Sequence, residues 1–351
     1  TTDWFAIWET TDAGKSFVSR VNGVSPVVPF CLAFDPNSAE NIAYGLADLG
    51  LFVSNDGGRS YYPPIAKPGT PERRCEIVTA CGNSLAYSTR TPGLLYVTGG
   101  KGAPVFRVSA DAGRTWKAPA MRGLPSGMRN GGIAPYAVSV HPVTDDVWIT
   151  MGGPVGCGRG GVYRSSDRGE TWQWAGEGLP AGEKLFKNSE FGHGGGPEIF
   201  FSRDGSAAVA HARVAGKVFW FDATVGCWRS AEGLPANVRG TLVADGFTPG
   251  RFLVAGTPLR ESTDGGRTWH VPAGLEKFAI SSLAADAAAP GLFAAVGYAA
   301  IYVSRDGAKT FSLLPKAFET VPSSLGRTIY LDRGRLYFLT TGTGVWVREI
   351  Q

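Results

Sequence analysis

The sequence predicts an all-β chain folded as a β-propeller of seven four-stranded blades, closed by strands from its two ends. Three observations lead to this prediction. One eight-residue pattern recurs along the chain, short strands with alternating apolar residues flank each copy, and 49 of the 351 residues are glycine. We expect residues 1–351 to form a single propeller domain, because an array of repeats can fill this length as one folded unit.

The recurring pattern, here called the octapeptide, reads Ser/Thr, any residue, Asp, any residue, Gly, any residue, Ser/Thr, aromatic. Intact copies occupy residues 10–17, 54–61, 109–116, 165–172 and 262–269. A weaker copy at 304–311 has Ala308 in place of Gly, and a degenerate copy at 221–228 has lost the Asp–Gly spacing. Their aspartates lie 42 to 56 residues apart, which is the length of one four-stranded blade.

The residue types of the octapeptide are those of a hairpin turn. Its Asp carboxylate can accept bonds from backbone N–H groups ahead of it, its Gly supplies a positive φ, and its hydroxyls can bond within the loop. We therefore expect these aspartates to hold turns rather than to do chemistry. The aromatic residue begins the next strand, and we expect Trp116, Trp172 and Trp269 to pack between neighbouring blades.

The two ends of the chain supply incomplete blades, whose strands we label A to D in chain order. Residues 5–12 and 16–21 read as strands C and D, and residues 327–332, 335–341 and 344–350 read as strands A, B and C. If the N-terminal strand D completes the last blade, the ring has seven blades and no exposed edge at the joint. One strand C is then surplus, and eight blades remain the alternative.

The composition limits the class of protein and its partners. The net charge is +4, with 18% charged and 43% hydrophobic residues, which indicates a folded protein and a charge below that of most nucleic-acid binders. No apolar run reaches the roughly 18 residues of a membrane span, and no signal-peptide pattern stands at the start. We expect the mature form of a secreted or periplasmic monomer that binds no nucleic acid.

The five cysteines show no CxxC spacing, so we expect no metal site, and nothing in the sequence calls for a cofactor. Cys75 and Cys81 could close a small disulfide loop in an oxidising compartment. Buried free thiols are the alternative for these two residues.

The octapeptide resembles the Asp box, or bacterial neuraminidase repeat, of the propellers in sialidases, in the sortilin luminal domain and in family 74 xyloglucanase-type glycoside hydrolases. The FRIP-like motif of sialidases is absent. Residues 44–51, YGLADLGL, are similar to the Tyr-x-x-x-Asp-x-Gly-Gly motif of the xyloglucanase group, with Leu51 in place of the second Gly. This resemblance implies that Asp48 is a catalytic carboxylate. That family pairs two tandem propellers with one acid from each, so it leaves the second acid of this chain unassigned.

Candidate acids are sought in the B–C and D–A loops, which share one face of a propeller, while the octapeptides lie on the other. Asp48 falls in one such loop, and Asp3 has nearly the same place in the N-terminal repeat. Glu190 stands in the glycine-rich segment 184–198, on the blade opposite Asp48. Two carboxylates across a channel are what an inverting glycosidase needs. The alternative is that each acid is an ordinary solvated or loop-capping residue.

Candidate ligand-binding residues on the same face are aromatic or basic. Trp4 and Tyr298 could stack on sugar rings. The polar candidates are His193, His211, Arg213, Arg159 and Lys101. A basic face with His211 and Tyr298 would also suit a polysaccharide lyase, in which a base abstracts a proton from an acidic sugar.

The sequence therefore favours a secreted, endo-acting glycoside hydrolase that acts on a plant or microbial polysaccharide or oligosaccharide. Two alternatives stay open. One is a lyase acting on an acidic polymer, and the other is a non-catalytic propeller that binds a glycan or a protein.

Overall fold

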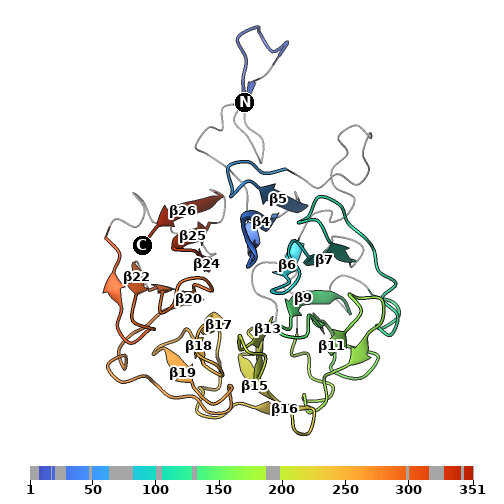
Figure 1. The fold of residues 1–351 in the computed structure, drawn as a ribbon, viewed down its shortest axis with the longest axis vertical. Coiled ribbons are helices and arrows are strands. Elements are labelled where there is room, and N and C mark those ends of the chain that lie inside the picture. Colours follow the sequence, from blue (N-terminus) through green and yellow to red (C-terminus); the bar gives the residue numbers. More distant parts are fainter. Residues whose placement is uncertain are drawn as a thin grey trace.

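The computed structural model describes residues 8–16, 18–19, 29–46, 50–62, 82–99, 105–128, 133–186, 198–297, 300–315, 328–340 and 344–350. Every regular element in these ranges is a β-strand. Seven antiparallel sheets stand around a central axis (Figure 1), which confirms the predicted propeller. No helix able to cross a membrane occurs in the ranges given above.

Each sheet is a meander of neighbouring strands, and we number the blades 1 to 7 in chain order. Blade 1 contains β3 (Pro29–Asp35), β4 (Ser38–Leu46) and β5 (Gly50–Asn55). Blade 2 contains β6 (Gly82–Tyr87), β7 (Leu95–Gly99) and β8 (Val105–Ser109). Blade 3 contains β9 (Pro135–Val140), β10 (Val147–Met151), β11 (Gly161–Ser165) and β12 (Gln173–Trp174). Blade 4 contains β13 (Glu198–Phe201), β14 (Ala208–Ala212), β15 (Lys217–Asp222) and β16 (Cys227–Ser230). Blade 5 contains β17 (Leu242–Ala244), β18 (Phe252–Val254) and β19 (Arg260–Ser262). Blade 6 contains β20 (Ser282–Ala285), β21 (Phe293–Val296), β22 (Ile301–Ser304) and β23 (Ser312–Leu313). Blade 7 contains β24 (Thr328–Asp332), β25 (Arg335–Leu339) and β26 (Val345–Glu349).

The strand that was surplus in the sequence count lies outside the ring. β1 (Trp8–Glu9) and β2 (Val18–Ser19) pair with each other and form a separate hairpin, drawn in blue beside the N-terminus in Figure 1. The seventh sheet consists of β24, β25 and β26 in the described part of the chain, so the predicted pairing of residues 16–21 with this sheet is not among the described strand pairs.

The octapeptides form turns, as their residue types predict. In the copy of blade 6, Ser304 donates its hydroxyl to Asp306 at 2.7 Å, and Thr310 donates both its backbone N–H and its hydroxyl to the same carboxylate. These bonds from Thr310, followed by the bond from Ser304, lower the pKa of Asp306 to about 2. Asp12, Asp56, Asp111, Asp167 and Asp264 make the same set of bonds in their own copies. The carboxylates of these aspartates thus accept the hydrogen bonds that hold the turns.

The tryptophans of the octapeptides occupy equivalent positions, as predicted. Each indole N–H of Trp116, Trp172 and Trp269 donates to the carbonyl oxygen of the glycine three residues earlier. Trp172 and Trp269 are buried, whereas Trp116 is half-buried. Trp172 meets the ring of Phe106 from blade 2 edge-on, with centroids 5.2 Å apart, so this side chain packs between two blades.

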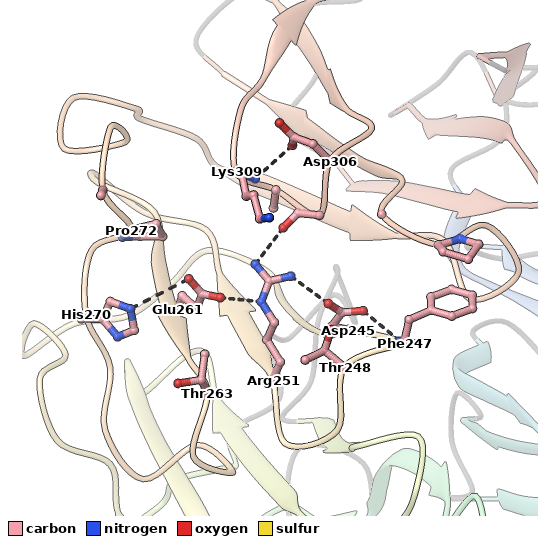
Figure 2. Close-up of a pocket in the computed structure, with 15 residues that line it drawn as sticks. Asp245, Phe247, Thr248, Arg251, Glu261, Thr263, His270, Pro272, Asp306 and Lys309 are labelled. Carbon is pink, nitrogen blue, oxygen red and sulfur yellow. Dashed lines mark hydrogen bonds and ion pairs between the residues drawn. The ribbon is translucent and has the colours of Figure 1, made fainter.

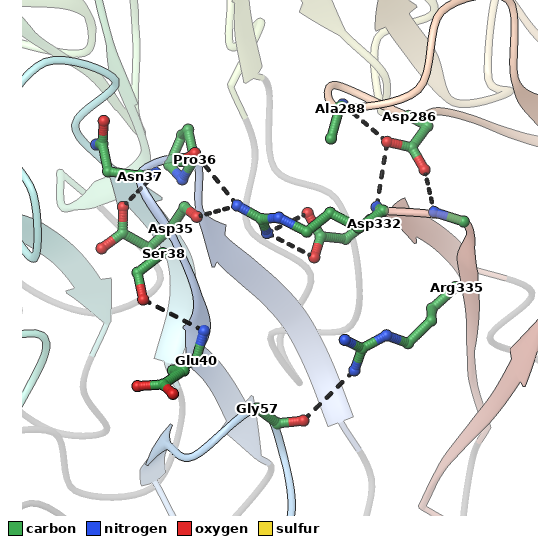
Figure 3. Close-up of polar contacts among 12 residues, drawn as sticks. Asp35, Pro36, Asn37, Ser38, Glu40, Gly57, Asp286, Ala288, Asp332 and Arg335 are labelled. Atoms are coloured by element: carbon green, nitrogen blue, oxygen red, sulfur yellow. Dashed lines mark hydrogen bonds and ion pairs between the residues drawn. The ribbon is translucent and has the colours of Figure 1, made fainter.

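Side chains of blade 7 close the ring against blade 1 (Figure 3). The guanidinium of Arg333 donates to the carbonyl oxygens of Asp35 and Pro36 at 3.1 and 3.2 Å, and Arg333 also forms an ion pair with Asp332. On the other side, Asp286 of blade 6 accepts the backbone N–H groups of Arg333 and Gly334. The apolar core at this joint contains Leu32, Ile42, Tyr337 and Leu339. The ring therefore closes through side-chain packing and bonds to the backbone.

We expect Trp172→Ala to lower the free energy of unfolding by roughly 3–5 kcal/mol, because it removes a fully buried ring between two blades. Trp116→Ala should cost less, because its ring is already partly exposed. Urea unfolding of both variants beside the parent measures this, and a Trp172→Ala protein as stable as the parent would contradict the packing role.

Candidate functional site

Most of the sequence candidates lie outside the described residues. These are Asp3, Trp4, Asp48, Lys101, Glu190, His193 and Tyr298. The structure places the remaining three, Arg159, His211 and Arg213, on blades 3 and 4. All three follow or end a strand B, so they stand at the face formed by the B–C and D–A connections. This face, on blades 3 and 4, is the candidate site.

The B–C connection of blade 3, residues 152–160, is held firmly by backbone contacts. Val155 donates its N–H to the carbonyl of Glu183 and accepts the N–H of Gly182 in the following D–A connection, at 3.1 and 3.0 Å. A side chain at Gly160 would lie 2.6 Å from the carbonyl oxygen of Gly153, so only glycine fits this fold-back. Arg159 is consequently displayed to solvent from a fixed loop.

His211 lies on β14 and is 3% exposed, so it is not available to a ligand at the surface. Its Nε2 donates to the carbonyl oxygen of Val238 at 3.0 Å, which ties blade 4 to the segment leading into blade 5. Burial lowers the pKa of His211 to about 4, although this hydrogen bond opposes the shift. The ring is therefore neutral at neutral pH. The predicted use of His211 as a substrate ligand or as the base of a lyase does not fit this position.

Glu198 is an acid of this face that the sequence analysis did not single out. It begins β13, the innermost strand of blade 4, and stands opposite His211 in the strand register. Its side chain is exposed to solvent, and the strand that carries it lies on the inner side of its blade (Figure 1). Desolvation by the surrounding protein raises the pKa of Glu198, and the nearby Arg213 guanidinium opposes the rise. Glu198 is thus a carboxyl group that holds its proton more readily than an ordinary glutamate.

Tyr330 is a phenol near enough to Glu198 to feel its charge. Tyr330 lies on β24 of blade 7, which stands on the other side of the ring from β13 in Figure 1, and the charges of Cys31, Glu198 and Arg213 all act on its hydroxyl. The Tyr330 ring packs against the apolar core between blades 7 and 1, and its hydroxyl contacts the backbone of Leu32. Burial, followed by the charges of Cys31 and Glu198, raises the pKa of Tyr330, so its hydroxyl remains a donor.

A second acid on this face is held in an ion pair. Glu183 contacts Lys217 at 2.8 Å, and both side chains are nearly half exposed, so the pair contributes little to stability. The described part of the site therefore offers a protonatable carboxyl, a phenol and guanidinium groups, which suit proton transfer and hydrogen bonding to hydroxyl-rich ligands. Within the described ranges, no group of three or more His, Cys, Asp or Glu residues is arranged to hold a metal ion.

No protein-family model matches the sequence, and no curated protein sequence is significantly similar to it. Solved structures share its fold. The GH74 enzyme of Niastella koreensis superposes with a TM-score of 0.67 at 15% identity, over 93% of this chain and 44% of the enzyme. YCF48 bound to D1 peptide superposes with a TM-score of 0.60 at 18% identity, over 93% of each chain. The β-propeller domain of Cps50 (Swd1) from Myceliophteria thermophila gives 0.59 at 13% identity, over 94% of this chain and 99% of that domain.

The chain has a GH74-like β-propeller fold. YCF48 and Cps50 share this fold, so the structural similarity alone does not identify an activity. The chain also spans less than half the length of the GH74 enzyme. Function must therefore be argued from the side chains.

The pH dependence of stability tests the position of His211. Its pKa is lower in the folded state than its ordinary value of 6.5, so the unfolded state binds the proton more readily between pH 6.5 and about 4. The buried neutral ring therefore stabilises the fold above pH 6.5, and about 3 kcal/mol of this is lost as the pH falls through 4. We expect His211→Gln, which can still donate to Val238, to lose less stability than the parent between pH 7 and pH 4.5.

Urea unfolding at the two pH values measures the difference, and His270→Gln is the control. The His270 ring is 57% exposed, so its replacement should leave the pH dependence of the parent intact. Equal losses of stability for the parent and His211→Gln would show that the His211 ring is not buried in its neutral form.

Proposed function

We propose that the chain is an endo-acting glycoside hydrolase that cleaves a neutral plant or microbial polysaccharide, with Glu198 as the general acid. The observation that carries this proposal is the raised pKa of a carboxyl group at the start of β13, the inner strand of blade 4 at the candidate site. A general acid has to hold its proton near the working pH until the leaving oxygen takes it. An ordinary surface glutamate is ionised under those conditions.

The second carboxylate of the proposed mechanism is Asp48. An inverting glycosidase holds its acid and its base roughly 6.5–9.5 Å apart, on opposite sides of the bond that breaks. Asp48 lies in the sequence between β4 and β5 of blade 1, and these strands stand across the axis from β13 in Figure 1. It would activate the attacking water. Glu190, in the segment that leads into β13, is the alternative partner.

The other groups of the site would hold the polymer. The hydroxyl of Tyr330 and the guanidinium groups of Arg213 and Arg159 are donors for sugar oxygens, which are neutral acceptors. Trp4 and Tyr298 are proposed as stacking surfaces on the strength of the sequence. A polysaccharide of this kind lies outside the cytoplasm, and we propose that the protein acts there.

A second candidate function is peptide binding without catalysis. YCF48 bound to D1 peptide matches this chain over 93% of both chains, whereas the match to the GH74 enzyme leaves more than half of that enzyme uncovered. A single propeller of this size is therefore known with a peptide partner. In that case Glu198 and Arg213 would serve as hydrogen-bonding groups for a polar peptide.

We expect Glu198→Gln and Asp48→Asn each to lower kcat/KM for cleavage of the polysaccharide at least about 10²-fold, because each removes an acid or a base from the transition state. Xyloglucan and neutral β-glucans are the first substrates to test, with new reducing ends as the readout. Thermal melting should change little, because the amides keep the shape of the acids.

Glu183→Gln is the matched control, since it alters another acid of the same face that is already paired with Lys217. It should retain the parental rate. Cleavage by Glu198→Gln at the parental rate would remove Glu198 from the mechanism. A parent that cleaves no glycan, but binds peptides in a manner that Glu198→Gln weakens, would overturn the hydrolase and favour the second candidate.

A further inference from the structure

A cleft of about 730 Å³ opens between blades 5 and 6 on the face that carries the octapeptide turns (Figure 2). It is remote from the candidate site, because A–B and C–D turns lie at one end of the strands and B–C and D–A connections at the other. Its floor comes from blade 5, and one wall comes from the octapeptide turn of blade 6, at Asp306 and Lys309. Its volume is in the range of small-molecule sites.

The floor of the cleft is an ion-paired network centred on Arg251. The guanidinium donates Nε to Glu261, one amino group to Asp245 at 2.7 Å, and the other to the carbonyl oxygen of Gly307 at 2.8 Å. The side chains of Arg251, Asp245 and Glu261 are between 6% and 13% exposed. The network is therefore nearly buried and fixes the orientation of Glu261.

Equivalent positions hold an apolar pair in blades 2 and 6, and a charge-reversed ion pair of Asp146 and Arg164 in blade 3. The residue before the octapeptide serine is Glu261 in blade 5 but valine in blades 2 and 6, at Val108 and Val303. The residue after the glycine of the A–B turn is Arg251 in blade 5 but leucine in blades 2 and 6. A buried ion pair is often no more stabilising than the apolar pair that it replaces. An ion pair at these positions thus occurs in two blades, and in blade 5 it borders the cleft.

The walls of the cleft combine donors, acceptors and apolar surface. His270 lies across the strand pair from Glu261, with Nε2 at 3.9 Å from its carboxylate, and is largely exposed. Lys309 is exposed on the opposite wall. Phe247, which is 37% exposed, and Pro272 supply apolar surface. The charge of Glu261 is already balanced by Arg251, and the lining adds donors and apolar edges, so it suits a neutral ligand rich in hydroxyl groups.

We infer that this cleft binds sugar units of a neutral polysaccharide, as a second site on the face opposite the candidate site. Each hydroxyl of such a ligand can donate to Glu261 and accept from His270 or Lys309, while the apolar edges of the ring pack on Phe247 and Pro272. The inference goes beyond the proposed function, since the cleft would hold the polymer without cleaving it.

The test uses the Glu198→Gln protein, so that bound oligosaccharide stays intact. Binding of cellohexaose and of a xyloglucan heptasaccharide is followed by calorimetry and by NMR shifts. We expect His270→Ala with Lys309→Ala to weaken binding about thirtyfold, because two hydrogen bonds at roughly 1 kcal/mol each are lost. Binding should also vary little with salt concentration, because the ligand is neutral.

The matched controls are Gln173→Ala and Arg59→Ala, which alter exposed residues at the equivalent positions of blades 3 and 1. They should bind as tightly as their parent. Equal affinity of the double variant and the controls, or binding of charged polymers only, would overturn the inference. A parent that cleaves no glycan but binds through His270 and Lys309 would overturn the proposed function alone. If the parent cleaves glycan but the double variant binds the oligosaccharides as tightly as the Glu198→Gln protein, the second site alone is overturned.

Discussion

A closed ring of contacts at the A–B turns is the constraint on which the rest of the propeller depends. A single meander cannot bury both of its faces, so each blade needs its neighbours at a fixed distance. Every blade bonds to the next near this turn. In order, the bonds run from Gly93 N to Asp35, Ser88 to Asp145, His141 to Gly205 O, Arg203 to Gly246 O, Arg251 to Gly307 O, Gly334 N to Asp286, and Arg333 to Asp35 O.

The ring of contacts fixes the octapeptide face and leaves the opposite face to other uses. Within several blades the octapeptide turn bonds to the A–B turn through a backbone N–H, as Gly307 does to the carbonyl of Gly291 at 3.0 Å. On the opposite face, the described bonds from His211 to Val238 and from Lys217 to Glu183 join neighbouring blades locally. Changes in the B–C and D–A connections can therefore alter a binding surface without opening the propeller.

The turns and the tryptophans could be predicted from the sequence because their bonds are local. Ser304, Asp306 and Thr310 lie within one octapeptide, so their spacing carries the whole network. The charge of Glu198 acts on Tyr330 only because the ring brings blades 4 and 7 near one another, and no sequence spacing encodes that distance. The burial of His211 had a visible signal, because its strand, AVAHA, is otherwise composed entirely of apolar residues. The alternation expected of an exposed strand is absent there.

In a repeat protein each blade solves the same packing problem, so a departure from the repeat that packing does not require points to another role. Blade 4 begins with Glu198 and has a degenerate octapeptide, yet Trp228 is still 1% exposed and donates to Ala175 O, so the packing is kept. Blade 5 has the ion pair of Arg251 and Glu261 where blades 2 and 6 have an apolar pair, and this ion pair borders a cleft. These two departures stand in adjacent blades but on opposite faces. An extended polymer that is held on one face and cleaved at the other would account for both.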